Sequence, residues 1–143
     1  MKGVLLLHIA AIAFWIGVVG AEFVIERSRA DNKPHGFAVA HNHFWIDVCL
    51  EIPVVLLVLA TGLLLLRDTP MTPLLAVKVA AGGFAAVANL VCIVPVTRRR
   101  RAAMKDALAE VIRQSKVIDR ISALAIPASA VAMLIGLYLL ASS

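Results

Sequence analysis

Long apolar runs alternate with short polar segments along the whole chain. The runs cover residues 3–26, 43–66, 73–96 and 119–141, and each contains few charged side chains. A helix needs about 20 such residues to cross the hydrocarbon core of a bilayer. Each run is therefore predicted to be a membrane-spanning helix. Together they predict an all-α fold, a four-helix transmembrane bundle formed by a single integral membrane domain of residues 1–143.

The composition supports a lipid environment. Apolar residues make up 62% of the chain and charged residues only 16%, whereas soluble domains are about a quarter charged. Cys49 and Cys92 lie in apolar runs and form no C-x-x-C motif, so the cysteines indicate no disulfide framework. The lipid bilayer is therefore the expected surrounding of most side chains.

Lysine and arginine are divided unequally between the two sides of the predicted bundle. The loops after the first and third runs carry eleven of them, whereas the opposite side carries only Lys2 and Arg67. Basic loops stay on the cytoplasmic side. We therefore predict a multi-pass protein of a bacterial-type inner membrane, with both termini on the outer, periplasmic side. No aromatic residues interleave with the run Arg98–Arg101, so nucleic acid is not an expected partner.

The basic third loop also has a helical pattern. Met104, Leu108, Val111, Ile112 and Ile118 recur at helical spacing among charged residues. This spacing predicts an amphipathic helix that either lies at the membrane surface or extends the flanking helices.

The two halves of the chain share a spaced motif. An Ile-Pro pair is followed by Gly-Leu, with nine residues from proline to glycine, at Ile52-Pro53 with Gly62-Leu63 and at Ile126-Pro127 with Gly136-Leu137. The segment around His8 also aligns with the segment around Lys78. These matches predict a duplicated helical hairpin, whose two copies would be related by a pseudo-two-fold axis along the membrane normal. The alternative is chance similarity between Leu/Ala-rich sequences. Glycines and alanines would allow close packing within the bundle or between protomers of a homo-oligomer.

His8 and Lys78 become equivalent positions under this repeat. Both lie at one depth, so we expect them to approach each other in the bundle. One interpretation makes neutral His8 an axial ligand of haem or of another metal, and the other makes it an imidazole hydrogen-bonded to a neighbouring helix. Lys78 either extends its stem to the outer surface or, if held inside, acts as a ligand or proton carrier.

A cluster of ionisable residues is predicted nearer the cytoplasmic end. Spacings of four place Glu22 and Glu26 on one face of the first helix, and His43, Asp47 and Glu51 on one face of the second. Antiparallel neighbours bring these faces to matching depths. Carboxylates and imidazoles from facing helices form divalent metal sites in helix bundles. The alternative is a solvated funnel in which the acids pair with basic residues, namely Arg27, Arg29 and Arg98–Arg101.

The order of several of these residues resembles a known family. The residues are His8 and Trp15-Ile16-Gly17, then Pro53 and Gly62-Leu63, then Lys78 and Asn89, over roughly residues 4–90. This pattern is similar to the HemJ-type protoporphyrinogen oxidases and the related CopD-like membrane proteins. The resemblance implies an all-helical membrane protein that holds b-type haem with His8 and Lys78 as ligands. The chain departs from the family at Ala21-Glu22-Phe23-Val24, where the pattern has Pro-Arg, and at Asn89, where it has histidine.

Three functional hypotheses follow from these features. The leading one is a membrane redox protein with haem b on His8 and Lys78 and with Trp15 packed on or near the porphyrin. Such a protein would act in electron transfer or porphyrinogen-type oxidation, with a quinone or another electron-transfer partner; as an enzyme it would be an oxidoreductase. The alternative is a protein that binds or transports a divalent metal ion through a cluster made of Glu22, Glu26, His43, Asp47 and Glu51. The third is a scaffold subunit with buried polar pairs.

Overall fold

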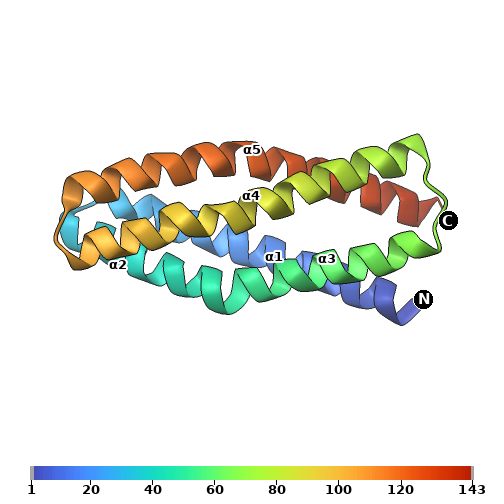
Figure 1. Cartoon of the computed structure of the whole chain (residues 1–143), viewed down its shortest axis with the longest axis horizontal. Helices are drawn as coiled ribbons and strands as arrows, with labels where there is room; N and C mark the ends of the chain where they lie inside the picture. Colours follow the sequence, from blue (N-terminus) through green and yellow to red (C-terminus); the bar gives the residue numbers. More distant parts are fainter. Residues whose placement is uncertain (1, 143) are drawn as a thin grey trace.

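The computed structural model describes residues 2–142, which form long helices joined by short turns (Figure 1). Helix α1 (Lys2–Arg27) continues through a single turn, η1 (Ser28–Ala30), to α2 (Lys33–Ile46). A π-helical turn, η2 (Asp47–Glu51), joins α2 to α3 (Ile52–Arg67). Helices α4 (Pro73–Met104) and α5 (Leu108–Ala141) complete the chain.

The helices form an all-α bundle of four rods. Because α2, η2 and α3 are continuous, the described chain has four helices that are long and apolar enough to cross a membrane. The predicted four-helix bundle is therefore confirmed. The chain starts and finishes at one end of the bundle, and the α1–α2 and α4–α5 connections lie at the opposite end (Figure 1). We call this opposite end the basic end.

The second rod begins earlier than the apolar pattern indicated. The prediction of a loop at 27–42 was wrong for most of that segment, because α2 starts at Lys33. The Asn32 side chain caps the helix by accepting a hydrogen bond from the His35 backbone N–H at 2.9 Å. Pro34 occupies the first turn, where its missing N–H costs nothing.

The third loop is almost entirely helical. Helix α4 runs to Met104 and α5 begins at Leu108, so the amphipathic segment extends the flanking helices. The connection between them is tight, and Asp106 there adopts a φ of 56°. Its carboxylate pairs with Lys33 at 2.6 Å, which ties this turn to the start of α2.

The bundle consists of two hairpins. Helix α1 packs mainly on α3, α4 packs on α5, and the hairpins meet chiefly through α2 and α4. Their shared core contains Trp15, Val55, Ala85 and Ala86, all buried. The two alanines let α4 approach the first hairpin closely. This contact brings the polar face of the first hairpin against α4.

Pro53 permits the π-helical turn η2. Pro53 has no N–H to bond, and its ring crowds the carbonyl four residues earlier. The helix widens there, and the Ile52 N–H bonds to the Asp47 carbonyl, five residues back. Turns of this kind frequently occur at functional sites. Here the turn carries two buried acids, Asp47 and Glu51.

Candidate metal centre

The structure brings together the five acidic and histidine residues expected in the cluster. Glu22 and Glu26 come from α1, His43 from α2, and Asp47 and Glu51 from η2. Four of them are buried, and Glu51 is only 3% exposed. As the antiparallel arrangement predicted, Glu26 contacts His43, whereas Glu22 lies further along α1 beside His43 and Asp47.

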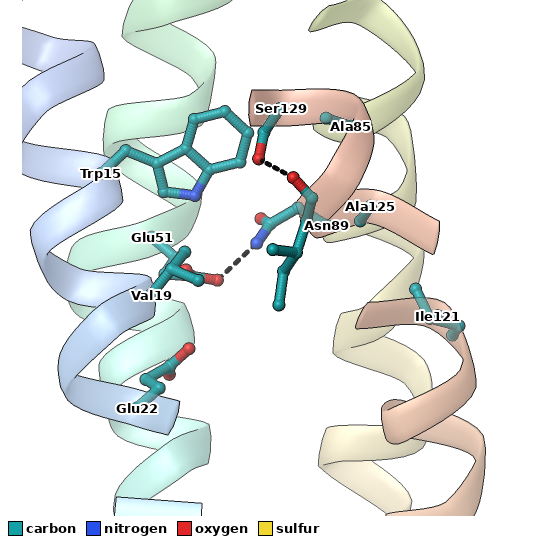
Figure 2. A pocket seen from close by; sticks show the side chains of 10 residues that line it. Trp15, Val19, Glu22, Glu51, Ala85, Asn89, Ile121, Ala125 and Ser129 are labelled. Atoms are coloured by element: carbon teal, nitrogen blue, oxygen red, sulfur yellow. Dashed lines mark hydrogen bonds between the residues drawn. The ribbon is translucent and has the colours of Figure 1, made fainter. Parts of the chain in front are cut away.

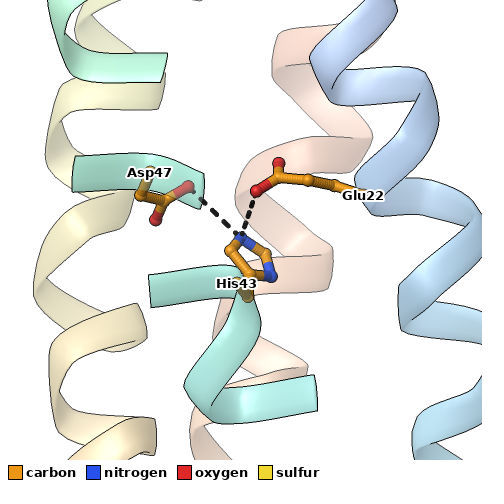
Figure 3. A group of neighbouring side chains, drawn as sticks. All are labelled: Glu22, His43 and Asp47. Atoms are coloured by element: carbon orange, nitrogen blue, oxygen red, sulfur yellow. Dashed lines mark ion pairs between the residues drawn. The ribbon is translucent and has the colours of Figure 1, made fainter. Parts of the chain in front are cut away.

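Three of these side chains converge on one point (Figure 3). The His43 Nε2 atom lies 3.6 Å from Glu22 Oε1 and 3.5 Å from Asp47 Oδ1. One ligand atom from each residue lies within 4.8 Å of the other two. Glu22 Oε1 is buried and has no hydrogen-bond partner. The group therefore offers an imidazole and two carboxylates, one with an unsatisfied oxygen, to a common centre.

The other nitrogen of His43 is fixed by Glu26. His43 Nδ1 lies 2.5 Å from Glu26 Oε1 and 2.8 Å from Arg99 Nη2. A carboxylate only accepts and a guanidinium only donates, so only one of the two can bond Nδ1. We assign the shorter contact, in which Nδ1–H donates to Glu26. A ring protonated only at Nδ1 would present the Nε2 lone pair to the centre between Glu22 and Asp47.

Glu26 differs from the other three acids because arginines neutralise it. Arg99 binds both of its oxygens, with distances of 2.6 and 3.0 Å, and Arg29 adds a bond of 2.8 Å. Arg99 is only 1% exposed and also donates to Ser115 Oγ at 3.3 Å. Arg29 continues to Asp119 of α5 at 2.6 Å. This network connects α1, α4 and α5 on the side of the centre that is nearer the basic end.

The solvated-funnel interpretation therefore holds only in part. Within residues 2–142, arginine ion pairs reach Glu26 but not Glu22, Asp47 or Glu51, and these three acids are buried. Arg27 lies over the Phe23 ring at 5.5 Å instead. Three buried carboxyl groups thus remain without an arginine partner.

A cavity of about 70 Å³ adjoins the centre between the two hairpins (Figure 2). Glu22 and Glu51 line it on the first hairpin, together with Trp15. The Glu51 Oε1 and Trp15 Nε1 atoms are buried without hydrogen-bond partners. The second Glu51 oxygen accepts a bond from Asn89 Nδ2 of α4 at 2.5 Å. A polar cavity of this size can hold water molecules that satisfy such groups.

His8 lies in the other half of the bundle, nearer the termini. Its Nδ1 atom is 2.8 Å from Thr61 Oγ1 of α3. The Thr61 hydroxyl donates to the Leu57 carbonyl at 2.7 Å, so it accepts from His8 Nδ1–H. The hydrogen-bonded imidazole foreseen from the sequence is therefore present. The same bond leaves the Nε2 lone pair of the neutral ring free to act as a ligand.

Lys78 occupies the matching position in the second hairpin. A Cβ atom at Gly136 would lie 2.9 Å from Lys78 Cε, just as one at Gly62 would lie 3.2 Å from His8 Cε1. Lys78 forms no ion pair with any described residue. No hydrogen bond joins it to His8 within residues 2–142, so the approach of the two side chains stays a prediction. Trp15 belongs to the neighbouring core and cavity.

Sequence reasoning missed three residues that hold these groups, whereas Arg99 was among the arginines expected to pair with the acids. Asn89 was noted only for its place in a family pattern, and Thr61 and Ser115 were not considered. Each of the three is a polar residue on an otherwise apolar helix face, and this is the signal that could have found them.

Comparisons of the chain with models of known protein families, with curated proteins and with solved structures gave no match. The resemblance to the HemJ-type and CopD-like proteins therefore stays a prediction. The function has to be inferred from the geometry of this chain.

Proposed function

We propose that this membrane protein binds a divalent metal ion through Glu22, His43 and Asp47. The separations of 3.6 and 3.5 Å between His43 Nε2 and the two carboxylates carry the proposal. Donors bonded at about 2.1 Å to one tetrahedral ion lie about 3.4 Å apart. The three side chains thus need little movement to share an ion.

The surroundings suit such an ion. Glu26 accepts the Nδ1 proton of His43, and this carboxylate–histidine pairing orients metal-bound imidazoles in many proteins. Two carboxylates balance the charge of a divalent cation, which removes the cost of burying them unpaired. One imidazole with carboxylates suits Mn²⁺, Fe²⁺ or Zn²⁺. Glu51 and water in the adjoining cavity would complete the coordination.

The site would lie in the cytoplasmic half of the membrane. With the basic end in the cytoplasm, both termini are periplasmic and the protein spans a bacterial-type inner membrane. The 70 Å³ cavity between the hairpins would supply the path for water and the ion. A protein that carries the ion across the membrane would use the same site.

Calorimetric titration of the purified protein in detergent tests the proposal. We expect Zn²⁺ or Mn²⁺ to bind with one-to-one stoichiometry. Glu22→Gln combined with Asp47→Asn should weaken binding at least about 100-fold, because losing one supporting interaction around a metal site already costs 10–100-fold. The matched control is Asp31→Asn with Asp68→Asn, which changes two exposed acids. Equal binding by both double variants would contradict the proposal.

A second candidate function is haem b binding at His8 and Lys78. The free Nε2 lone pair of His8, fixed by the Thr61 bond, favours it, and Lys78 offers an amine without an ion-pair partner among residues 2–142. The cavity beside Trp15 is smaller than the roughly 300–1,000 Å³ of typical cofactor sites. The haem would therefore require the hairpins to separate in the outer half, where they contact each other less.

Absorption spectroscopy of the purified membrane protein tests the haem candidate. A bound haem would give a Soret band, His8→Ala would abolish it, and Lys78→Met would shift it, since a thioether still ligates iron. Such a protein would exchange electrons with a quinone or another redox partner. A spectrum without a Soret band after expression with added haem precursor would remove this candidate and leave the metal site.

A further inference from the structure

A second pocket lies at the basic end, away from the candidate metal centre. Its volume is about 230 Å³. The pocket is bounded by the last turns of α4, the α4–α5 connection and the first turn of α5, with lining residues Arg98, Arg101, Ala102, Lys105, Ala107 and Glu110.

The four consecutive arginines of α4 have different surroundings. Arg99 is buried and paired with Glu26, and Arg100 lies over the Phe44 and Trp45 rings at 4.4 and 5.3 Å. Arg98 and Arg101, by contrast, are exposed and form no ion pair with any residue of the described range 2–142. Half of the run thus serves the fold, and the other half is available to a ligand.

The pocket carries a strong positive charge. Arg98, Arg101 and Lys105 follow at spacings of three and four, which places them on one face of α4. Glu110 is the one acid in the lining, and its oxygens are bonded by Arg113 at 2.8 Å and by Gln114 at 2.7 Å. Three exposed cations therefore face one pocket with its carboxylate already neutralised.

The position of the pocket along α4 matches the lipid headgroups. Residues 73–97 precede the first arginine, and these 25 residues form a helix about 37 Å long. The hydrocarbon core is about 30 Å thick. Arg98 therefore emerges just outside the hydrocarbon, at the level where phosphate groups lie.

We propose that this pocket binds the phosphoryl headgroup of an anionic phospholipid. Arginine forms strong, directional bonds with phosphate oxygens, and basic pockets between transmembrane helices on the cytoplasmic side bind lipids such as cardiolipin. A lipid is favoured over free phosphate because its acyl chains would lie along the exposed apolar faces of α4 and α5, for example at Val94.

Native mass spectrometry and lipid titration in detergent micelles test the proposal. The test variant is Arg98→Gln with Arg101→Gln and Lys105→Gln. The control removes the same charge from exposed residues outside the pocket, with Arg27→Gln, Lys116→Gln and Arg120→Gln. We expect the wild-type protein to retain cardiolipin or phosphatidylglycerol but not phosphatidylcholine. The test variant should bind roughly 100-fold more weakly, since each basic side chain near the surface contributes roughly fivefold.

The outcomes separate the possible occupants. Retention of the anionic lipid by the control variant and its loss from the test variant support the proposal. Equal loss from both would indicate diffuse charge attraction and overturn it. Displacement of the lipid by millimolar inorganic phosphate would assign the pocket to a free anion, and tighter binding of a short oligonucleotide would assign it to nucleic acid. Either of these results also overturns the proposal.

Discussion

The two hairpins share their backbone plan but differ in chemistry. Each position of α1 corresponds to the position of α4 that is 70 residues later, so His8 matches Lys78. Each position of the second rod corresponds to the position of α5 that is 74 residues later, so Gly62 matches Gly136. In both hairpins the ionisable side chain packs on the glycine. The acids of the first hairpin have no acidic counterparts in the second. Their equivalents are Cys92 for Glu22, Ile121 for Asp47 and Ala125 for Glu51.

The cavity shows what this difference achieves. Several lining residues form equivalent pairs from opposite hairpins: Trp15 with Ala85, Val19 with Asn89, and Glu51 with Ala125. In two of these pairs a large or charged side chain faces an alanine (Figure 2). In these two pairs the first hairpin supplies the larger side chain and the second supplies space. A duplication with strictly equal halves would have placed twice the number of carboxylates in one buried volume, at a large electrostatic cost.

The equivalent prolines also behave differently. Pro53 follows the π-helical turn η2, whereas Pro127 lies within α5, which stays α-helical around it. Within residues 2–142, the wider turn occurs only in the hairpin that carries buried acids. A proline permits the distortion, and we infer that the polar contacts of Asp47 and Glu51 select it.

The largest expected effect comes from breaking the ion pair between Glu26 of the first hairpin and Arg99 of the second. Arg99→Gln leaves Arg29 as the one arginine paired with Glu26 among residues 2–142, and removing one partner of a buried pair costs about 3–5 kcal/mol of unfolding free energy. Reversible unfolding in mixed micelles measures the loss. Arg120→Gln, at an exposed position, is the control and should change stability by less than about 0.5 kcal/mol.

A double variant sharpens this test. The second hairpin has Val96 where the first has Glu26. Combining Glu26→Gln with Arg99→Gln should recover a large part of the lost stability, because no unpaired charge then remains. If the double variant is as unstable as Arg99→Gln, the pair does not explain the loss.

A smaller effect is expected at the contact between the hairpins. Asn89→Ala removes the bond to Glu51 Oε2 and should cost about 1–3 kcal/mol, the range for leaving a buried acceptor without its partner. Asn42→Ala, on the exposed side of α2, is the matched control. Equal unfolding free energies for the two variants would show that this bond contributes nothing to the association of the hairpins.

These contacts also show how far the sequence alone could lead. Run length predicted the four spans, because the bilayer demands about 20 apolar residues whatever the packing. Spacings of four predicted that Glu22, Glu26, His43, Asp47 and Glu51 share faces, because helix geometry fixes which side chains align. Both results depend only on local features of the sequence, namely the length of an apolar run and the spacing of polar residues.

Tertiary contacts could not be predicted in this way. The partner of Glu26 depends on how α4 is rotated, and only the packed structure shows that Arg99 turns inward while Arg98 turns outward. The early start of α2 depends on an Asn32 cap that hydropathy does not register. The π-helical turn depends on a proline together with buried acids. No periodicity in the sequence reports such a combination.

The tautomer of His8 gives a third test of the difference between hairpins. Thr61→Val removes the acceptor for Nδ1–H and should cost about 1 kcal/mol, as for a neutral hydrogen bond. It should also shift the ring proton toward Nε2, which ¹⁵N NMR of the imidazole detects. Thr69→Val is the control, since Thr69 makes the same hydroxyl-to-carbonyl bond without a histidine. Unchanged imidazole ¹⁵N shifts in Thr61→Val would contradict the assigned tautomer.

The smallest effect compares the two glycines that receive His8 and Lys78. Alanine at either position gains the same helix propensity, so the difference between Gly62→Ala and Gly136→Ala reports the neighbour. A Cβ at Gly136 would meet Lys78 Cε at 2.9 Å, but the flexible lysine stem can move aside. A Cβ at Gly62 would meet His8 Cε1 at 3.2 Å, and the Thr61 bond holds that ring in place.

We therefore expect Gly62→Ala to be less stable than Gly136→Ala by about 1 kcal/mol, within the usual cost of overpacking. Adding Thr61→Val should release the ring and reduce this difference. A larger loss in Gly136→Ala would instead show that Lys78 is the more rigidly held of the two equivalent side chains.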